Sequence, residues 1–247
     1  MRTSNQLLLA FAAIVVAIPF VLAFGAKAGV RSAVELSGVR AERTLEALPF
    51  KHLDVRGPIT LILTAGLPEV RLEGDQALLD LIDDEAAGDK LTLDLDSATG
   101  VAPADKLTAY VRTPELDKLE LRGQASARGP EALPYRRLHI EGAGGPNVDL
   151  AFTDAAALRV EYSGGGYAKL AGRVADLDID LAGGSTVEAR DLAAHVARVD
   201  ASGGHTLDLR VDSLLDVSGA GSLKIRYVGS PKVSSRGSGN VSVEQVD

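Results

Sequence analysis

From Leu116 onward, short segments in which apolar and polar residues alternate recur at a nearly constant spacing along the chain. Alternation with a period of two is typical of a β-strand with one buried face. A glycine-rich step and a second short strand follow most of these segments. The first strands of the units are Leu119–Leu121, Leu138–Ile140, Leu158–Val160, Leu177–Ile179, Arg198–Val199, Leu215–Val217 and Lys232–Val233. A fixed period of about 20 residues predicts a solenoid, because each unit can bury its apolar side only against its neighbours.

Two architectures fit a unit of strand, Gly-Gly and strand: a meander of antiparallel hairpins, or a parallel β-helix with equivalent strands stacked about 4.8 Å apart. The outward residues of the first strands are Glu120, His139, Arg159, Asp178, Arg198, Asp216 and Lys232, and their signs alternate from Arg159 onward. Those of the second strands are Asp149, Lys169, Glu188, Asp208 and Lys224, with one like-charged step. Alternation between equivalent positions requires that they be neighbours, which favours the parallel stack.

Residues 45–115 predict a different β-rich part that precedes the repeats. Strands are expected at 50–56, 59–64, 68–73, 90–94 and 106–112, separated by steps that contain Gly or Pro. Asp75 is a suitable N-cap for a short helix, Gln76–Asp83, with Leu78, Leu79 and Ile82 on one face. The repeats then occupy residues 116–247.

The N-terminal segment is apolar and uncharged from Leu7 to Ala26, and it follows Arg2 and the α-amino group. This pattern indicates an export signal or a helical signal-anchor. The run is long enough to cross a bilayer as a helix, for which about 20 residues are needed. Ala26-Lys27-Ala28 instead offers a site for cleavage before Gly29.

Both alternatives for this segment predict export of the rest of the chain. Residues 1–28 are a signal peptide or membrane anchor, residues 29–44 a linker, and residues 45–247 the folded domain. The expected location is the periplasm or cell envelope. An uncleaved segment would be the chain's contact with the membrane and would anchor it to the inner membrane.

Composition narrows the function classes. The chain has 247 residues and a net charge of −8, whereas a nucleic-acid-binding protein would show a basic surface. No cysteine is present, which excludes disulfides, thiolate metal sites and cysteine nucleophiles. There is no Gly-x-Ser-x-Gly, phosphate loop or His-Glu-x-x-His motif, and the four histidines have no ligand spacing. The sequence predicts no catalytic residues, no metal set and no cofactor.

The order of several short motifs resembles the bacterial family of the putative autotransporter adhesin head, or GIN, domain. The resemblance covers residues 47–243. The motifs are Leu48–Val55, Glu73-Gly74-Asp75 before Leu78-Leu79, Gly88–Leu93, Thr113–Leu116, the Ser-Gly-x-Gly steps and Tyr227–Pro231. This resemblance implies an all-β fold, namely a right-handed parallel β-helix or solenoid with one short helix in its N-terminal part. In this chain the apolar signal or anchor helix precedes that fold. The family supplies no catalytic residues.

A second outward column is a candidate ligand site. Glu141, Glu161, Asp180 and Asp200 follow the last apolar residue of four successive first strands. Carboxylates stacked about 5 Å apart repel one another. Either water and salt screen this repulsion on a solvated face, or a hard divalent cation such as calcium bridges the oxygens.

A small contact patch is a further hypothesis. Tyr162 and Tyr167 flank the turn at 163–166, and His205 follows Gly203-Gly204 in another turn. The alternatives are that the tyrosines cover an edge of the core and that His205 is a solvated turn residue.

The sequence therefore predicts a non-enzymatic envelope binding or scaffold module, adhesin-like, with a protein or polysaccharide partner. The alternative is a carbohydrate-active enzyme, a polysaccharide lyase or hydrolase on a β-helix. Such sites need paired carboxylates or a cation, and aromatic platforms for sugars. An open polar face would favour the binding module, whereas a cleft with converging carboxylates would favour the enzyme.

Overall fold

The computed structural model of the chain describes residues 34–45, 49–95 and 100–247. Contacts divide the chain into two units, Met1–Ser32 and Ala33–Asp247, and the described residues belong to the second unit. The predicted signal or anchor, 1–28, and its cleavage site lie outside the described residues. Within the described ranges, no helix is long and apolar enough to cross a membrane.

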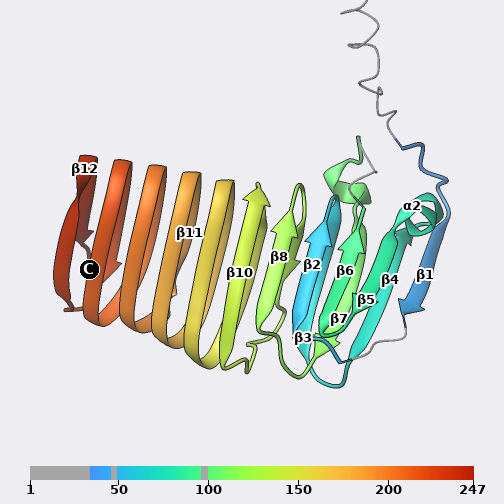
Figure 1. Cartoon of the computed structure of the whole chain (residues 1–247), viewed down its shortest axis with the longest axis horizontal. Helices are drawn as coiled ribbons and strands as arrows, with labels where there is room; N and C mark the ends of the chain where they lie inside the picture. Colours follow the sequence, from blue (N-terminus) through green and yellow to red (C-terminus); the bar gives the residue numbers. More distant parts are fainter. Residues whose placement is uncertain (1–33, 46–48, 96–99) are drawn as a thin grey trace, which may run out of the picture. The chain divides into compact units, whose positions relative to one another are not determined.

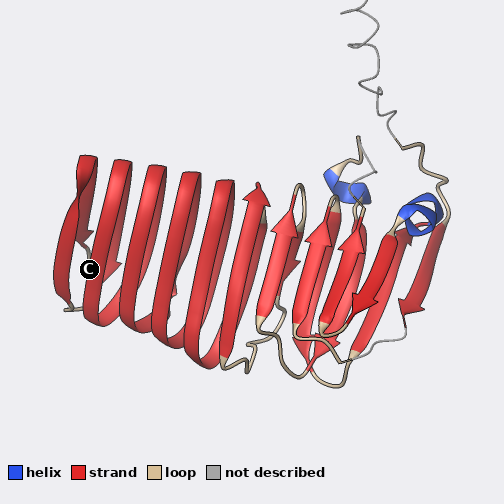
Figure 2. Ribbon diagram, viewed as in Figure 1, coloured by secondary structure: helices blue, strands red, loops and turns tan. Residues whose placement is uncertain are grey.

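The described residues are nearly all strand, which confirms the predicted all-β class (Figures 1 and 2). The strands are β1 (Arg40–Leu45), β2 (His52–Arg56), β3 (Ile59–Ala65), β4 (Glu69–Asp75), β5 (Asp83–Ala87), β6 (Lys90–Asp94), β7 (Leu107–Thr113), β8 (Lys118–Arg122), β9 (Ser126–Arg128), β10 (Arg137–Gly144), β11 (Asn147–Val228) and β12 (Lys232–Gln245). The helices are α2 (Gln76–Leu81) and the 3₁₀ helix η1 (Pro103–Asp105).

The repeats pair in parallel with their neighbours. The sheet order is β1-β4-β7-β3-β9-β11-β10-β8-β2-β6-β5, and β12 pairs with β11. Lys118 lies opposite His139, Leu138 opposite Leu158, and Leu215 opposite Val233, so each first strand lies beside the first strand of the next unit. These parallel pairs exclude the hairpin meander. Antiparallel pairing occurs in the N-terminal part, at β1–β4, β4–β7 and β5–β6.

The alternating apolar positions of both halves of each turn meet in one core. In the turn before β12, Leu215 and Val217 precede the corner at Gly221, and Leu223 and Ile225 follow it. All four side chains are at most 1% exposed and belong to the same hydrophobic cluster. Figure 1 shows the chain rising along one side of this region and returning along the other. The outward side chains of the rising half form one face of the domain.

Stacked glycines make one corner of the turns, as the sequence predicts. Gly183 has φ of 107° and Gly203 has φ of 123°. A Cβ built on Gly203 would lie 2.1 Å from the carbonyl oxygen of Gly183, and one on Gly183 would lie 2.3 Å from that of Gly164. Each corner therefore requires both a left-handed backbone and the absence of a side chain.

The N-terminal part contains the predicted strands and helix, but α2 ends at Leu81 rather than Asp83, and two further strands are present. Asp75 caps α2, because its carboxylate accepts a hydrogen bond from Ala77 N–H at 2.9 Å. The linker prediction for 29–44 is wrong at residues 40–44, since β1 begins at Arg40 and pairs antiparallel with β4. Strand β5 was not predicted either, because all five of its residues are exposed and lack alternation.

Candidate functional site

The parallel register arranges the outward side chains of the rising half in columns. One column contains His52, Lys118, His139 and Arg159, and the next contains Asp54, Glu120, Glu141 and Glu161. The prediction that Glu120 shares a column with His139 is wrong, because Glu120 lies opposite Glu141. The cause is local: β8 has outward residues on both sides of Leu119, and alternation alone does not fix which one is level with His139.

A network of ion pairs and histidine–carboxylate contacts joins the two columns, and we call it the charge ladder. It consists of Lys118, His139, Arg159, Glu120, Glu141, Glu161 and Asp180. Each basic residue lies between two carboxylates on successive turns. The Nζ of Lys118 is 2.8 Å from a Glu120 oxygen and 2.7 Å from a Glu141 oxygen.

The next two steps of the charge ladder repeat this geometry. The Nε2 of His139 lies 3.5 Å from a Glu141 oxygen and 3.1 Å from a Glu161 oxygen. Arg159 approaches Glu161 at 3.2 Å and Asp180 at 3.7 Å. The repulsion expected within the acidic column is therefore offset by the neighbouring basic column.

The inner end of the charge ladder is the most buried. The Glu120 side chain is 7% exposed and also accepts a hydrogen bond from Arg122 at 2.7 Å. Burial opposes its ionisation, but the hydrogen bonds and charges of Lys118 and Arg122 outweigh burial and lower the pKa of Glu120 to about 2. Asp54, fully buried in the next strand, is held by Arg56 and Lys90 at 2.6 and 2.9 Å.

The basic partners of Asp54 and Glu120 are not among the predicted site residues, although the sequence contains a pattern that indicates them. Strand β2 reads His-x-Asp-x-Arg and strand β8 reads Lys-x-Glu-x-Arg, so both present base, acid and base on one face. The predicted column takes only the central outward residue of a strand, such as Glu120, so the basic residues on either side of it are left out.

The alternating column predicted beyond Arg159 is partly correct. Arg198 lies 3.3 Å from Asp178, as expected for adjacent turns. The assignment of Lys232 is wrong, because Lys232 lies opposite Leu214 and Ser234 lies opposite Asp216. The last unit has a polar Ser235 opposite Val217, so the apolar pair that marks the strand in other units is missing. Asp216 instead pairs with Arg236, at 3.3 Å.

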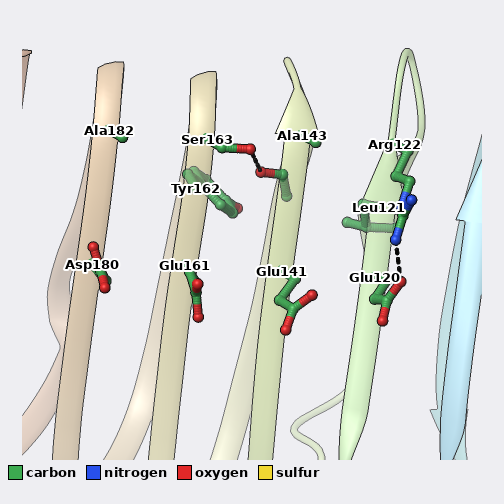
Figure 3. Close-up of a pocket in the computed structure, with 11 residues that line it drawn as sticks. Glu120, Leu121, Arg122, Glu141, Ala143, Glu161, Tyr162, Ser163, Asp180 and Ala182 are labelled. Atoms are coloured by element: carbon green, nitrogen blue, oxygen red, sulfur yellow. Dashed lines mark hydrogen bonds and ion pairs between the residues drawn. The ribbon is translucent and has the colours of Figure 1, made fainter.

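A shallow groove of about 290 Å³ runs beside the acidic column (Figure 3). Figure 3 shows the carboxylates of Glu120, Glu141, Glu161 and Asp180 in a row on successive strands. Small side chains lie level with Arg122 on the following strands: Ala143, Ser163 and Ala182. The basic residues of the charge ladder do not line the groove. Carboxylates are therefore the charged groups that line the groove along its length, with Arg122 at one end.

The structure brings the predicted acidic residues to this surface. Three of them, Glu141, Glu161 and Asp180, line the groove. Asp200 lines a second groove of about 360 Å³, which also includes Asp180. His139, Glu141 and Glu161 have ligand atoms within 4.8 Å of one another, a geometry that fits a metal ion. These atoms already engage the charge ladder, so the acidic column has a source of neutralisation that needs no cation.

The predicted contact patch requires a correction. Tyr162 is 1% exposed and His205 4% exposed, so neither side chain is at the surface. Tyr162 fits beside Gly142 and Gly166, where a Cβ would lie within 2.8 Å of its ring. Tyr167 is half-buried and donates a hydrogen bond to Glu188 at 2.7 Å. Alternation places Tyr162 on the inward face, which is why it packs in the core.

His205 joins two stacked corners. Its Nδ1 accepts a hydrogen bond from Ser185 N–H, and its Nε2–H donates to the carbonyl of Ser202, each at 3.1 Å. Both ring nitrogens are therefore used in the interior of the domain. The role of His205 is structural, unlike either surface role considered from the sequence.

The groove lacks two features of a carbohydrate-cleaving site. The one aromatic side chain among its lining residues, Tyr162, is buried. The most buried carboxylate, Glu120, has a lowered pKa, whereas a general acid for glycoside cleavage needs a raised one. Among the described residues, the groove lining therefore has carboxylates but neither an exposed aromatic platform nor a carboxyl group with a raised pKa.

Solved structures share this fold. A putative adhesin from Bacteroides fragilis NCTC 9343 superposes with a TM-score of 0.80 at 21% identity, over 87% of this chain and 100% of the other. A putative adhesin from Parabacteroides distasonis ATCC 8503 gives 0.67 at 16% identity, and a putative lipid binding protein from the same strain gives 0.65 at 18%, with the same coverages. At these identities the likeness concerns the fold.

The sequence comparison identifies the family. No curated protein matches the chain. Residues 49–231 match the family described as "Putative auto-transporter adhesin, head GIN domain". This match covers most of the chain and agrees with the order of the sequence motifs, so the protein belongs to the head GIN domain family.

Proposed function

We propose that this protein is an exported, non-enzymatic binding module of the cell envelope, adhesin-like, whose binding surface is the groove beside the charge ladder. The observation that carries the proposal is the row of carboxylates from Glu120 to Asp180 along an open groove (Figure 3). The groove crosses successive parallel strands, so it can follow an extended partner rather than enclose a small molecule.

A right-handed parallel β-helix is the proposed support for this surface. The parallel register between successive units supports it, as does the return of the chain through glycine corners. Such a stack holds outward side chains at fixed spacings, because every turn is tied to its neighbours by backbone hydrogen bonds. The binding surface would therefore be preorganised.

A basic segment of a protein is the partner that this groove fits. The side chains of Glu141, Glu161 and Asp180 are 32%, 42% and 55% exposed, so their oxygens remain accessible while paired with the charge ladder. An exposed aromatic platform for sugar stacking is missing from the groove lining. A neutral polysaccharide would therefore gain less from this surface than a chain with lysine or arginine side chains.

Export to the periplasm or cell envelope rests on two supports. The apolar run at residues 7–26 is typical of a signal or anchor, and the family description names an auto-transporter adhesin. Attachment to the inner membrane would follow if the segment is retained.

Peptide binding tests this function. Fluorescence anisotropy would compare labelled peptides of equal length that are basic, neutral or acidic, at low and high salt. We expect the basic peptide to bind, with an affinity that falls as salt rises. The double variant Glu161→Gln/Asp180→Asn should weaken binding about tenfold or more, because it removes two exposed charges from the groove.

A single-charge control is available on another part of the domain. Asp149→Asn removes one exposed carboxylate from the strand segment that pairs with β9, outside the groove, and should leave binding unchanged. Equal binding of the acidic and basic peptides, or equal loss in the control, would contradict the proposal. Binding of a neutral glycan that is insensitive to the groove variant would favour a different surface.

A further inference from the structure

The last strand of the domain leaves one edge open. Strand β12 pairs with β11 from Leu214↔Lys232 to Tyr227↔Gln245, and β11 is its partner among the described strands. Its other edge presents backbone N–H and C=O groups without a described strand beside them. An exposed edge of 14 residues is a template for pairing with another chain.

The core is also incompletely covered at this end. Val233 is 38% exposed, and Val241 and Val243 are only partly buried. The residues opposite them in the preceding turn, such as Leu215 and Ile225, are fully buried. A further layer of strand would bury these valines as the preceding turn is buried.

The shape of β12 allows a second copy to provide this layer. Residues 232–238 rise to the corner at Gly239, which has φ of 98°, and residues 240–245 return on the other side of the core (Figure 1). A two-fold axis through the corner would place the rising half of one copy beside the returning half of the other. Because these halves run in opposite directions, the new pairs would be antiparallel.

Side-chain complementarity selects one register for these pairs. Inward residues must face inward residues, since a slip by one position would turn every valine outward. Within this constraint, one alignment places Lys232 opposite Glu244 and Val233 opposite Val243. It also places Ser234 opposite Ser242 and Arg236 opposite Asn240, so no like charges face each other. Slipping this alignment by two positions in either direction loses the Lys232–Glu244 pair, although one of the two slips places Val233 opposite Val241.

We propose that the β12 edge is a homodimerisation surface whose partner is β12 of a second copy of this chain. The two-fold axis makes every contact occur twice, so the dimer has two Lys232–Glu244 pairs and two Val233–Val243 pairs. It also closes the assembly, because each copy covers the open edge of the other. This inference is independent of the groove and its ligand.

Charge reversal and rescue test the register. Sedimentation velocity over a range of concentrations would measure dimerisation of the full chain in a mild detergent. Lys232→Glu alone and Glu244→Lys alone should each weaken the dimer about tenfold or more, because each places two like-charged pairs opposite one another. The double variant Lys232→Glu/Glu244→Lys restores both pairs with opposite polarity and should restore the dimer. Association through the N-terminal segment would persist in all three variants.

Cysteine crosslinking provides a second measurement. The chain has no cysteine of its own, so Ser234→Cys and Ser242→Cys can be introduced singly. When the two variant chains are mixed and oxidised, a crosslinked heterodimer should form faster than either homodimer. Within one copy these serines lie on opposite sides of the core and point outward, so an intramolecular bond does not compete.

Three results would overturn the proposal. The first is a chain that stays monomeric at concentrations up to the millimolar range. The second is a dimer that is insensitive to both single reversals. The third is weakening by Lys232→Glu without rescue in the double variant, which would indicate a head-to-tail contact with an acidic surface such as β5, whose exposed residues include Asp83 and Glu85.

Discussion

Adding one methyl group to a stacked glycine corner should destabilise the domain strongly, whereas the same change one residue later should not. Gly203 has φ of 123°, a conformation that costs a residue with a Cβ about 1–3 kcal/mol. Its Cβ would also lie 2.1 Å from the carbonyl oxygen of Gly183, which is a backbone atom and cannot rotate away. The two effects together should make Gly203→Ala cost at least about 2 kcal/mol.

Gly204 is a matched control for this substitution. A Cβ on Gly204 meets nothing within 4 Å, and Gly204 is not among the glycines with positive φ. Gly204→Ala should therefore be neutral, or stabilise the fold by up to about 1 kcal/mol by restricting the unfolded chain. The pair isolates the corner, since both variants change the same residue type in the same turn.

Thermal unfolding followed by circular dichroism measures the difference. For a domain of this size, each kcal/mol shifts the Tm by about 2–4 °C, so Gly203→Ala should lower the Tm by about 4 °C or more. Gly204→Ala should leave the Tm unchanged or raise it slightly. A Gly203→Ala variant that melts with the parent chain would refute the argument, because it would show that the corner can open to admit a side chain.

Three further predictions concern charge and burial. Neutralising either member of the exposed Asp178–Arg198 pair, by Asp178→Asn or Arg198→Gln, should cost under about 1 kcal/mol in urea unfolding. The double variant should cost less than the sum of the two single losses, because both remove the same contact, and additive losses would contradict that contact. The pKa of Glu120 is lowered to about 2 in the folded chain, so its stabilising effect is present above its unfolded pKa of about 4.5 and is lost as pH falls toward 2. Glu120→Gln should therefore flatten the acid limb of a plot of unfolding free energy against pH. An unchanged acid limb would refute this. Tyr162→Phe removes a buried hydroxyl that has no hydrogen-bond partner, so the urea midpoint of this variant should equal or exceed that of the parent chain. Lys118→Met should instead lower the urea midpoint, because it leaves the buried Glu120 without one of its cations.

Local chemistry in the sequence determined most of the elements and the faces of their strands. Alternation separated inward Leu138 and Ile140 from outward His139, and Asp75 marked the start of the helix. Glycine runs marked corners such as Gly183 and Gly203, because few other residues accept that backbone. These features depend on a few consecutive residues, so a sequence pattern is sufficient to find them.

The register between successive strands was decided by the tertiary structure. Alternation says which face a residue occupies but not which residue of the next turn lies beside it, since that depends on how many residues each corner uses. Glu120 therefore joined Glu141 rather than His139, and Ser234 replaced Lys232 beside Asp216. The charge ladder and the groove arise from this register, which is a property of the packed turns and not of any single strand.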